Sequence, residues 1–164
     1  MTVYGISASG PTTPGDTNHT PDVCIDGNVN PLPDNADGKF CYVKNALDNA
    51  WWLQLDLGYT ASISRVDVYR SSNAQNGQDY QYDIETLDEN GNWQQCASDQ
   101  GASLAPRGTA NPSACDATSQ YVRLLFSQQS FNIRQIMVFS DSTGSASCIA
   151  CGVGTFNDNN GMGS

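Results

Sequence analysis

The chain has 164 residues, enough for one globular domain but not for two complete ones. Its 7 Lys and Arg against 17 Asp and Glu give a formal net charge of −10, which argues against nucleic acid or an anionic lipid surface as a partner. No apolar run approaches the ~20 residues that cross a bilayer, so we expect no membrane insertion.

The first clear strand follows an irregular N-terminal segment. Residues 1–22 are rich in Gly, Pro, Ser and Thr, so we interpret them as a strap or linker. From Trp51 to Leu57 apolar and polar side chains alternate, which is the pattern of a strand with one buried face, and we expect Gly58 to end it. We assign both Trp51 and Trp52 to the core.

More strands are predicted at short spacing along the chain. Period-two alternation and apolar runs indicate them at residues 65–69, 80–85, 121–126 and 133–139. The segment Asp88–Asn92 contains residues that tolerate positive φ and predicts a hairpin turn, whereas the polar stretch 97–113 is interpreted as a long loop. Because no window carries a helical stripe, the fold class we expect is all-β, an antiparallel sandwich or jelly roll with little helix.

The character of the sequence changes after Ser140. The last residues are small and polar and contain two closely spaced cysteines, Cys148 and Cys151. Such a segment cannot bury a core, so we place a domain boundary near Asp141. The chain then divides into a strap at 1–22, one domain at 23–140 and a tail at 141–164.

Six cysteines indicate an oxidising compartment, because they lie among many Gly, Asn, Asp and Ser residues. We therefore expect a secreted, extracellular or cell-surface protein, and the sequon Asn18-His19-Thr20 agrees with this. Zinc binding by Cys148 and Cys151 is the competing interpretation. It is disfavoured because there is no second close cysteine pair and the only histidine is far away in sequence.

Four segments of the sequence together resemble one known family. They are Cys24-Ile-Asp-Gly-Asn28, Cys41, Trp51-Trp-Leu-Gln-Leu-Asp-Leu-Gly58 and Ile63-Ser-Arg-Val-Asp-Val-Tyr-Arg70. In this order they are similar to the signature of F-type lectins (fucolectins) and the related discoidin or coagulation factor 5/8 C-type domains. The resemblance covers about residues 23–140. It implies an eight-stranded jelly roll of the galactose-binding-like type, with binding loops at one end.

The resemblance also implies a sugar site. F-type lectins bind fucose with a His two residues after a cysteine, an Arg, an acidic residue two positions later and a further basic residue. This sequence has Val43, Arg70, Ser72 and Gly77 at those positions, so only the Arg is kept. Sugar hydroxyls need converging polar groups, so we expect another glycan geometry, or a surface ion pair for Arg70. The other candidate ligand residues are Tyr42, Lys44, Asn45, Asp48, Asn73, Gln78 and Tyr80.

A structural calcium ion is implied in the same way. The family builds an oxygen cage from the Asp-Gly-Asn loop, nearby backbone carbonyls and an acidic residue of the final strand. Asp26 and Asn28 match directly, Val23 and Phe40 would supply carbonyls, and Gln135 takes the place of the acid. Calcium accepts amide oxygens, so Gln is admissible. The alternative for Asp26-Gly27-Asn28 is an ordinary turn.

The resemblance further implies two disulfides, Cys96 with Cys115 and Cys24 with Cys41, the second of which would clamp the calcium loop. The segment from Cys148 to Gly161 resembles the start of an ephrin-receptor-like cysteine-rich repeat. The pairing of Cys148 and Cys151 stays open, since a redox Cys-x-x-Cys is the alternative.

Two functions fit these features. One is a calcium-stabilised glycan-binding module. The other is a structural or cell-adhesion domain of a larger extracellular protein, which binds no sugar and has an extracellular protein as its partner. Paired carboxylates such as Asp83 and Glu85 could suggest an enzyme, but they alternate with inward residues on one strand and read as a solvated sheet surface. No Ser-based triad is visible, so we expect no enzymatic activity.

Overall fold

The computed structural model describes residues 5–8, 20–27, 41–44, 51–70, 81–100, 110–126, 130–142 and 145–148. Its elements are the strands β1 (Gly5–Ala8), β2 (Cys41–Lys44), β3 (Trp51–Arg70), β4 (Tyr82–Leu87), β5 (Trp93–Gln100), β6 (Ala110–Phe126), β7 (Ser130–Ser142) and β8 (Ser145–Cys148), and the short 3₁₀ helix η1 (Pro21–Ile25). The predicted all-β antiparallel fold is therefore confirmed, with helix limited to η1 in the described part.

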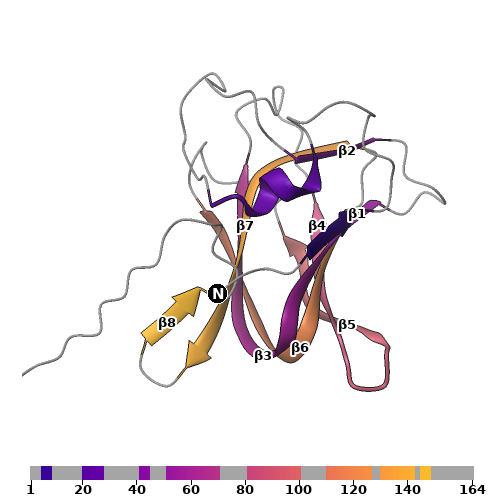
Figure 1. The fold of residues 1–164 in the computed structure, drawn as a ribbon. Helices are drawn as coiled ribbons and strands as arrows, with labels where there is room; N and C mark the ends of the chain where they lie inside the picture. The colour runs from indigo at the N-terminus through magenta and orange to yellow at the C-terminus, as the bar shows by residue number, and fades with distance from the viewer. Residues whose placement is uncertain are drawn as a thin grey trace, which may run out of the picture.

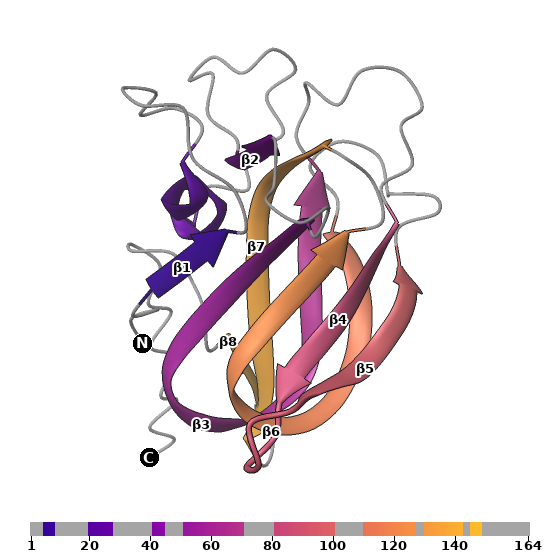
Figure 2. The ribbon, with the colours of Figure 1, turned by 90° about the vertical axis from the view of Figure 1, so that its right-hand side faces the viewer.

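Two long bent strands organise the sheet, whose order is β2-β7-β3-β6-β4-β5, with β1 added to β3 and β8 to β7. The first half of β3 pairs with the second half of β6, and the second half of β3 pairs with the first half of β6. Both strands curve round the lower end of the molecule, so each belongs to both layers of a jelly-roll sandwich (Figures 1 and 2). The front layer, nearer the viewer in Figure 2, contains the first half of β3, the second half of β6, β4 and β5. The back layer contains the first half of β6, the second half of β3 and β7.

The core fills the space between the two layers. In β3 the buried side chains are Leu53, Leu55, Leu57, Ala61 and Ile63, and then Val66 and Val68. Their spacing changes from odd to even numbers at a register shift between Ile63 and Arg65. A β-bulge of this kind moves every later side chain to the opposite face, which keeps the core side apolar after the strand has changed layers.

Gly58 does not end a strand, contrary to the sequence expectation. It has a φ of +76° and its N–H donates to the Asp56 carboxylate over 2.8 Å, within a register shift between Asp56 and Ala61. The positive φ suits glycine because it has no Cβ. Gly58 therefore lies at the corner where β3 bends from one layer into the other.

The predicted hairpin at Asp88–Asn92 is confirmed, because β4 and β5 pair on either side of it. The Asp88 carboxylate accepts bonds from the backbone N–H groups of Asn90 and Asn92 over 2.9 and 2.8 Å, and Gly91 has a φ of +79°. These hydrogen bonds, the backbone bond from Asn92 first, lower the pKa of Asp88 below its usual value.

Several other sequence predictions need correction. The stretch 97–113 is not one long loop, since β5 extends to Gln100 and β6 begins at Ala110. Trp52 is half-buried and lies outside the core cluster, on the face of β3 opposite to Leu53. The strands β1 and β8 were not predicted at all, although they pair with β3 and β7.

Candidate ligand-binding end

Most strand ends of the sandwich gather at one end. Pairing brings Lys44 opposite Ser130, Trp51 opposite Phe126, and Arg70 opposite Ile133. Tyr82 pairs with both Phe126 and Gln100, so β4, β5 and β6 reach the same place. We call this the upper end, as it is drawn in Figures 1 and 2. Loops at such an end can supply binding residues on a rigid scaffold.

Three of the predicted ligand residues belong to strands at the upper end. Tyr42 and Lys44 lie in β2, which pairs with the start of β7, and Arg70 ends β3 on the other side of β7. Because neighbouring strands are about 4.8 Å apart, the backbones of β2 and β3 are separated here by about 10 Å. The other candidates, Asn45, Asp48, Asn73, Gln78 and Tyr80, lie outside the described residues, so the site as a whole stays a prediction.

The start of β7 is irregular where β3 ends. Tyr69 pairs with Gln135 but Arg70 pairs with Ile133, so Arg134 is an extra residue in β7. Bulges of this kind redirect side chains and are common next to functional sites. The four residues from Ile133 to Ile136 are all buried, with Arg134 only 6 % exposed and Gln135 fully covered.

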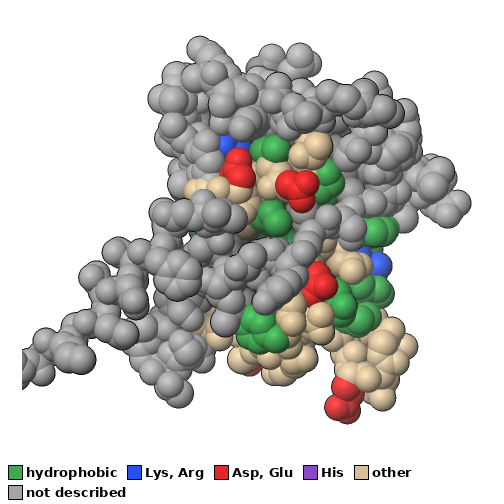
Figure 3. Space-filling model, in the orientation of Figure 1, with side chains coloured by type: hydrophobic (Ala, Val, Ile, Leu, Met, Phe, Trp, Pro, Cys, Tyr) green, Lys and Arg blue, Asp and Glu red, His purple; other side chains and the backbone are tan. Residues whose placement is uncertain are grey.

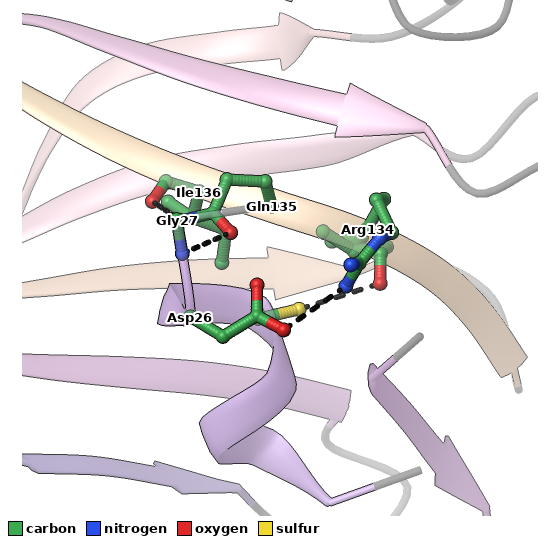
Figure 4. Close-up of polar contacts among 7 residues, drawn as sticks. Asp26, Gly27, Arg134, Gln135 and Ile136 are labelled. Atoms are coloured by element: carbon green, nitrogen blue, oxygen red, sulfur yellow. Dashed lines mark hydrogen bonds and ion pairs between the residues drawn. The ribbon is translucent and has the colours of Figure 1, made fainter. Parts of the chain in front are cut away.

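The buried polar residues Arg134 and Gln135 hold the loop that follows η1 (Figure 4). The Arg134 guanidinium forms an ion pair with the Asp26 carboxylate, Nη1 to Oδ2, at 3.4 Å. The backbone N–H of Gly27 donates to the Gln135 side-chain oxygen over 3.1 Å. The Gln135 amide nitrogen donates in turn to the Ile136 carbonyl over 3.2 Å. Two consecutive residues of β7 are thus tied to two consecutive residues after η1.

Cys24 also joins η1 to this part of β7. It is fully buried and disulfide-bonded, and its sulfur lies 3.5 Å from the Ile133 carbonyl oxygen. A disulfide sulfur carries no hydrogen, so this is a packing contact and not a hydrogen bond. Cys41 is the residue of β2 that pairs with Ile133, which brings Cys24 and Cys41 to the same residue of β7 from two directions.

The other implied disulfide lies away from the upper end of the strands. Cys96 of β5 and Cys115 of β6 are joined, with an S–S distance of 2.04 Å. Cys115 lies in the part of β6 that pairs with the second half of β3, whereas β5 pairs with β4. The bond therefore connects an outer strand of the front layer to the back layer.

The described part of the predicted calcium cage fits the ion poorly. Asn28 and Phe40 lie outside the described residues. Of the remaining side chains, Asp26 has an arginine partner and the Gln135 oxygen already accepts an N–H. A calcium ion on the Asp26 carboxylate would lie within about 6 Å of the guanidinium, and their repulsion is about 5 kcal/mol at an effective dielectric constant of about 20. In the described part of the chain no three His, Cys, Asp or Glu side chains cluster as metal ligands.

Acidic side chains outnumber basic ones on the described surface that Figure 3 shows. Figure 3 shows acidic side chains at several separate places on one face, with little Lys or Arg among the side chains it colours. The buried or half-buried arginines have local acidic partners: Arg65 with Asp67, Arg123 with Glu85 and Arg134 with Asp26. They therefore do not form a basic surface. None of the helices in the described ranges is long and apolar enough to span a membrane.

These features define a jelly-roll sandwich of the galactose-binding type, with most described strand ends and the irregular start of β7 at one end. The match to a known family agrees: the NedA-like, galactose-binding domain family matches residues 23–124, well over half of the chain, and the chain belongs to this family. The ephrin-receptor-like repeat has no such support. No curated protein matches the chain.

Several solved structures with the same fold are carbohydrate-binding proteins by name. A carbohydrate-binding module from Clostridium perfringens, in complex with GalNAc-beta-1,3-galactose, has a TM-score of 0.63 and 15% identity, with 83% of this chain and 94% of that chain covered. A fucose binding module of Streptococcus pneumoniae has a TM-score of 0.62, 18% identity and 83% and 93% coverage. The lectin domain of lectinolysin, complexed with Lewis B antigen, has a TM-score of 0.65 and 16% identity, with 84% of this chain and 93% of that chain covered. At such low identity, these likenesses show the fold alone.

Proposed function

We propose that this chain is an extracellular, non-catalytic module that binds neutral glycans at its upper end. The observation that carries the proposal is the pairing of β7 with β2 on one side and with the end of β3 on the other. It brings Tyr42, Lys44 and Arg70 to one region from two separate parts of the sequence. The family, and the sugars named for the similar structures, support a saccharide as the ligand.

The chemistry of these residues suits a neutral sugar. Arg and Lys donate hydrogen bonds to hydroxyl oxygens, and Tyr combines a hydroxyl with a ring that packs on the apolar face of a sugar. Asn45, Asp48, Asn73 and Gln78 are proposed to add acceptors and further donors. A polyanionic ligand is disfavoured by the net charge of −10.

Fucose recognition by the usual triad of F-type lectins is not part of the proposal. Val43 and Gly77 carry no polar side-chain group for a hydroxyl, and Ser72 lacks the charge of an acid. We therefore propose a different geometry around Arg70, and expect galactose or GalNAc-containing glycans to be better ligands than fucose.

A calorimetric titration with a panel of galactose, GalNAc, fucose and mannose oligosaccharides tests the proposal. We expect saturable binding with a Kd in the millimolar to micromolar range, or about −4 to −8 kcal/mol. Arg70→Ala should weaken binding at least tenfold. The matched control is Arg65→Ala on the same strand, since Arg65 pairs with Asp67 and contacts the Phe139 ring well below the upper end.

The alternative function is an adhesion or structural domain that binds an extracellular protein. The observation in its favour is the loss of three of the four fucose-binding positions, at Val43, Ser72 and Gly77. Absence of binding to every glycan of the panel, by a protein that melts cooperatively, would favour this alternative and contradict the glycan proposal.

A further inference from the structure

We infer that Arg134 and Gln135 replace a metal ion in this protein, so that the loop after η1 is held on β7 by protein groups and its stability is independent of calcium. The proposal goes beyond glycan binding and does not require it. Its central observation is that the two described side chains of the implied cage already have protein partners: the Asp26 carboxylate pairs with the Arg134 guanidinium, and the Gln135 oxygen accepts the Gly27 N–H.

The first argument is that each interaction of a bound cation has a counterpart here. A cation would neutralise the Asp26 carboxylate, and the Arg134 guanidinium does this at 3.4 Å. A cation would also bridge the loop to the last long strand, and the Gly27 N–H does this through its bond to Gln135. Figure 4 shows both links running from the loop after η1 to adjacent residues of β7.

The second argument is burial. Arg134 is 6 % exposed and Gln135 is fully covered, although both are polar and lie in a strand of otherwise apolar buried residues. Buried polar groups are retained when hydrogen bonds or ion pairs satisfy them. The extra residue in β7 supplies the mechanism, because the bulge lets two successive side chains reach one loop instead of opposite faces.

The third argument is position. The links fix η1 next to Ile133, which pairs with Cys41 on one side and Arg70 on the other. Arg134 and Gln135 thus position the loop after η1 beside the start of β7. The Arg134 guanidinium also balances the charge of the Asp26 carboxylate. These side chains therefore carry no net negative charge that would attract a divalent ion.

The experiment compares the 164-residue chain and its variants by thermal melting, with calcium chloride alone as the probe against EDTA, and by calorimetric titration with calcium chloride. A cation that binds the folded protein and is present at a free concentration of about 100 times its Kd would raise Tm by about 5–10 °C. For the unmodified chain we expect the same Tm in both buffers and no saturable heat. A calcium-dependent rise in the Tm of the unmodified chain would by itself overturn the proposal.

The variants test the roles of the two residues. Arg134→Met should lower Tm in EDTA by several degrees, and an unchanged Tm would overturn the proposal. The double variant Arg134→Met, Gln135→Glu replaces the guanidinium and the amide with a second carboxylate, and should gain a calcium-dependent rise in Tm. As a control, Gln95→Glu adds one carboxylate at an exposed position of β5 and should show no calcium response.

Discussion

The Ser119 hydroxyl shows how one residue joins two strands at the lower end. Ser119 is buried in β6, and its oxygen accepts bonds from the backbone N–H groups of Leu87 and Tyr121 over 3.2 and 3.0 Å. It also lies 2.9 Å from the Leu87 carbonyl and 2.8 Å from the Tyr121 carbonyl, either of which can accept its single hydrogen. The end of β4 is thereby fixed to the bend of β6.

Ser119→Ala should destabilise the protein by about 1–3 kcal/mol, because it leaves partly buried backbone groups without their partner. A denaturant titration measures the free energy of unfolding. Ser62→Ala, at an exposed position of β3, is the matched control and should change it by less than about 0.5 kcal/mol. Equal effects of the two substitutions would contradict the role assigned to Ser119.

Asp67 is a buried acid on the side of β3 that faces away from the core. Its carboxylate lies 2.8 Å from the Arg65 guanidinium, although the two atoms do not form a well-directed hydrogen bond. Burial raises the pKa of Asp67 above its ordinary value, and the charge of Arg65 opposes this only in part. The folded protein therefore holds the Asp67 proton more tightly than the unfolded chain does.

This shift makes ionised Asp67 a cost to stability. Because the pKa is higher in the folded state, the contribution of Asp67 is most favourable below its ordinary value near pH 4 and is lost as pH rises through the folded pKa. The Tm of Asp67→Asn relative to the unmodified protein should therefore rise from pH 3.5 to pH 7. A difference in Tm that is constant, or falls, over this pH range would contradict the assignment.

At the scale of elements, the Cys96–Cys115 disulfide joins the two layers by a covalent bond. It closes a loop with a sequence separation of 19, and Cys115 is 1 % exposed within the core cluster. Replacing both cysteines by Ala should cost about 3 kcal/mol, mainly because the unfolded chain is no longer constrained. Chemical denaturation measures this loss, and a loss below about 1 kcal/mol would show that β5 is held by its pairing with β4 alone.

The sequence predicted the straight parts of the strands well and their corners poorly. Alternation at Leu53, Leu55 and Leu57 was sufficient to predict a strand, because one face of this strand is buried. Gly58 was interpreted as an end because local pattern cannot distinguish a turn from a bend within a strand that changes layers. β1 and β8 are only four residues each, and their pairing with β3 and β7 depends on partners far away in sequence.

Only part of the candidate site could be predicted from the sequence. The resemblance pointed to Arg70 and to the region of Gln135, and the pairing of β7 brings both strands to one end. The role of Arg134 could not be read from the sequence, because it depends on a bulge that gives one extra residue to β7. An Arg within a predicted strand of apolar residues is the one sequence signal that could have indicated the role of Arg134.

At the scale of the whole molecule, the fold persists at identities of 15–18% to the three carbohydrate-binding structures, so it is specified by pattern and not by particular residues. The core needs only apolar side chains at the inward positions of two layers. Ligand choice must therefore be determined by the residues of this end in this chain.

The most direct test of glycan binding at the upper end is an NMR titration of the labelled protein with a GalNAc-galactose disaccharide. We predict concentration-dependent shifts of the backbone amides of Tyr42, Lys44, Arg70 and Ile133, and no shifts in the Asp88–Asn92 turn at the lower end. Shifts confined to the lower end or to the outer face of β4 and β5, or none at saturating disaccharide, would contradict the account.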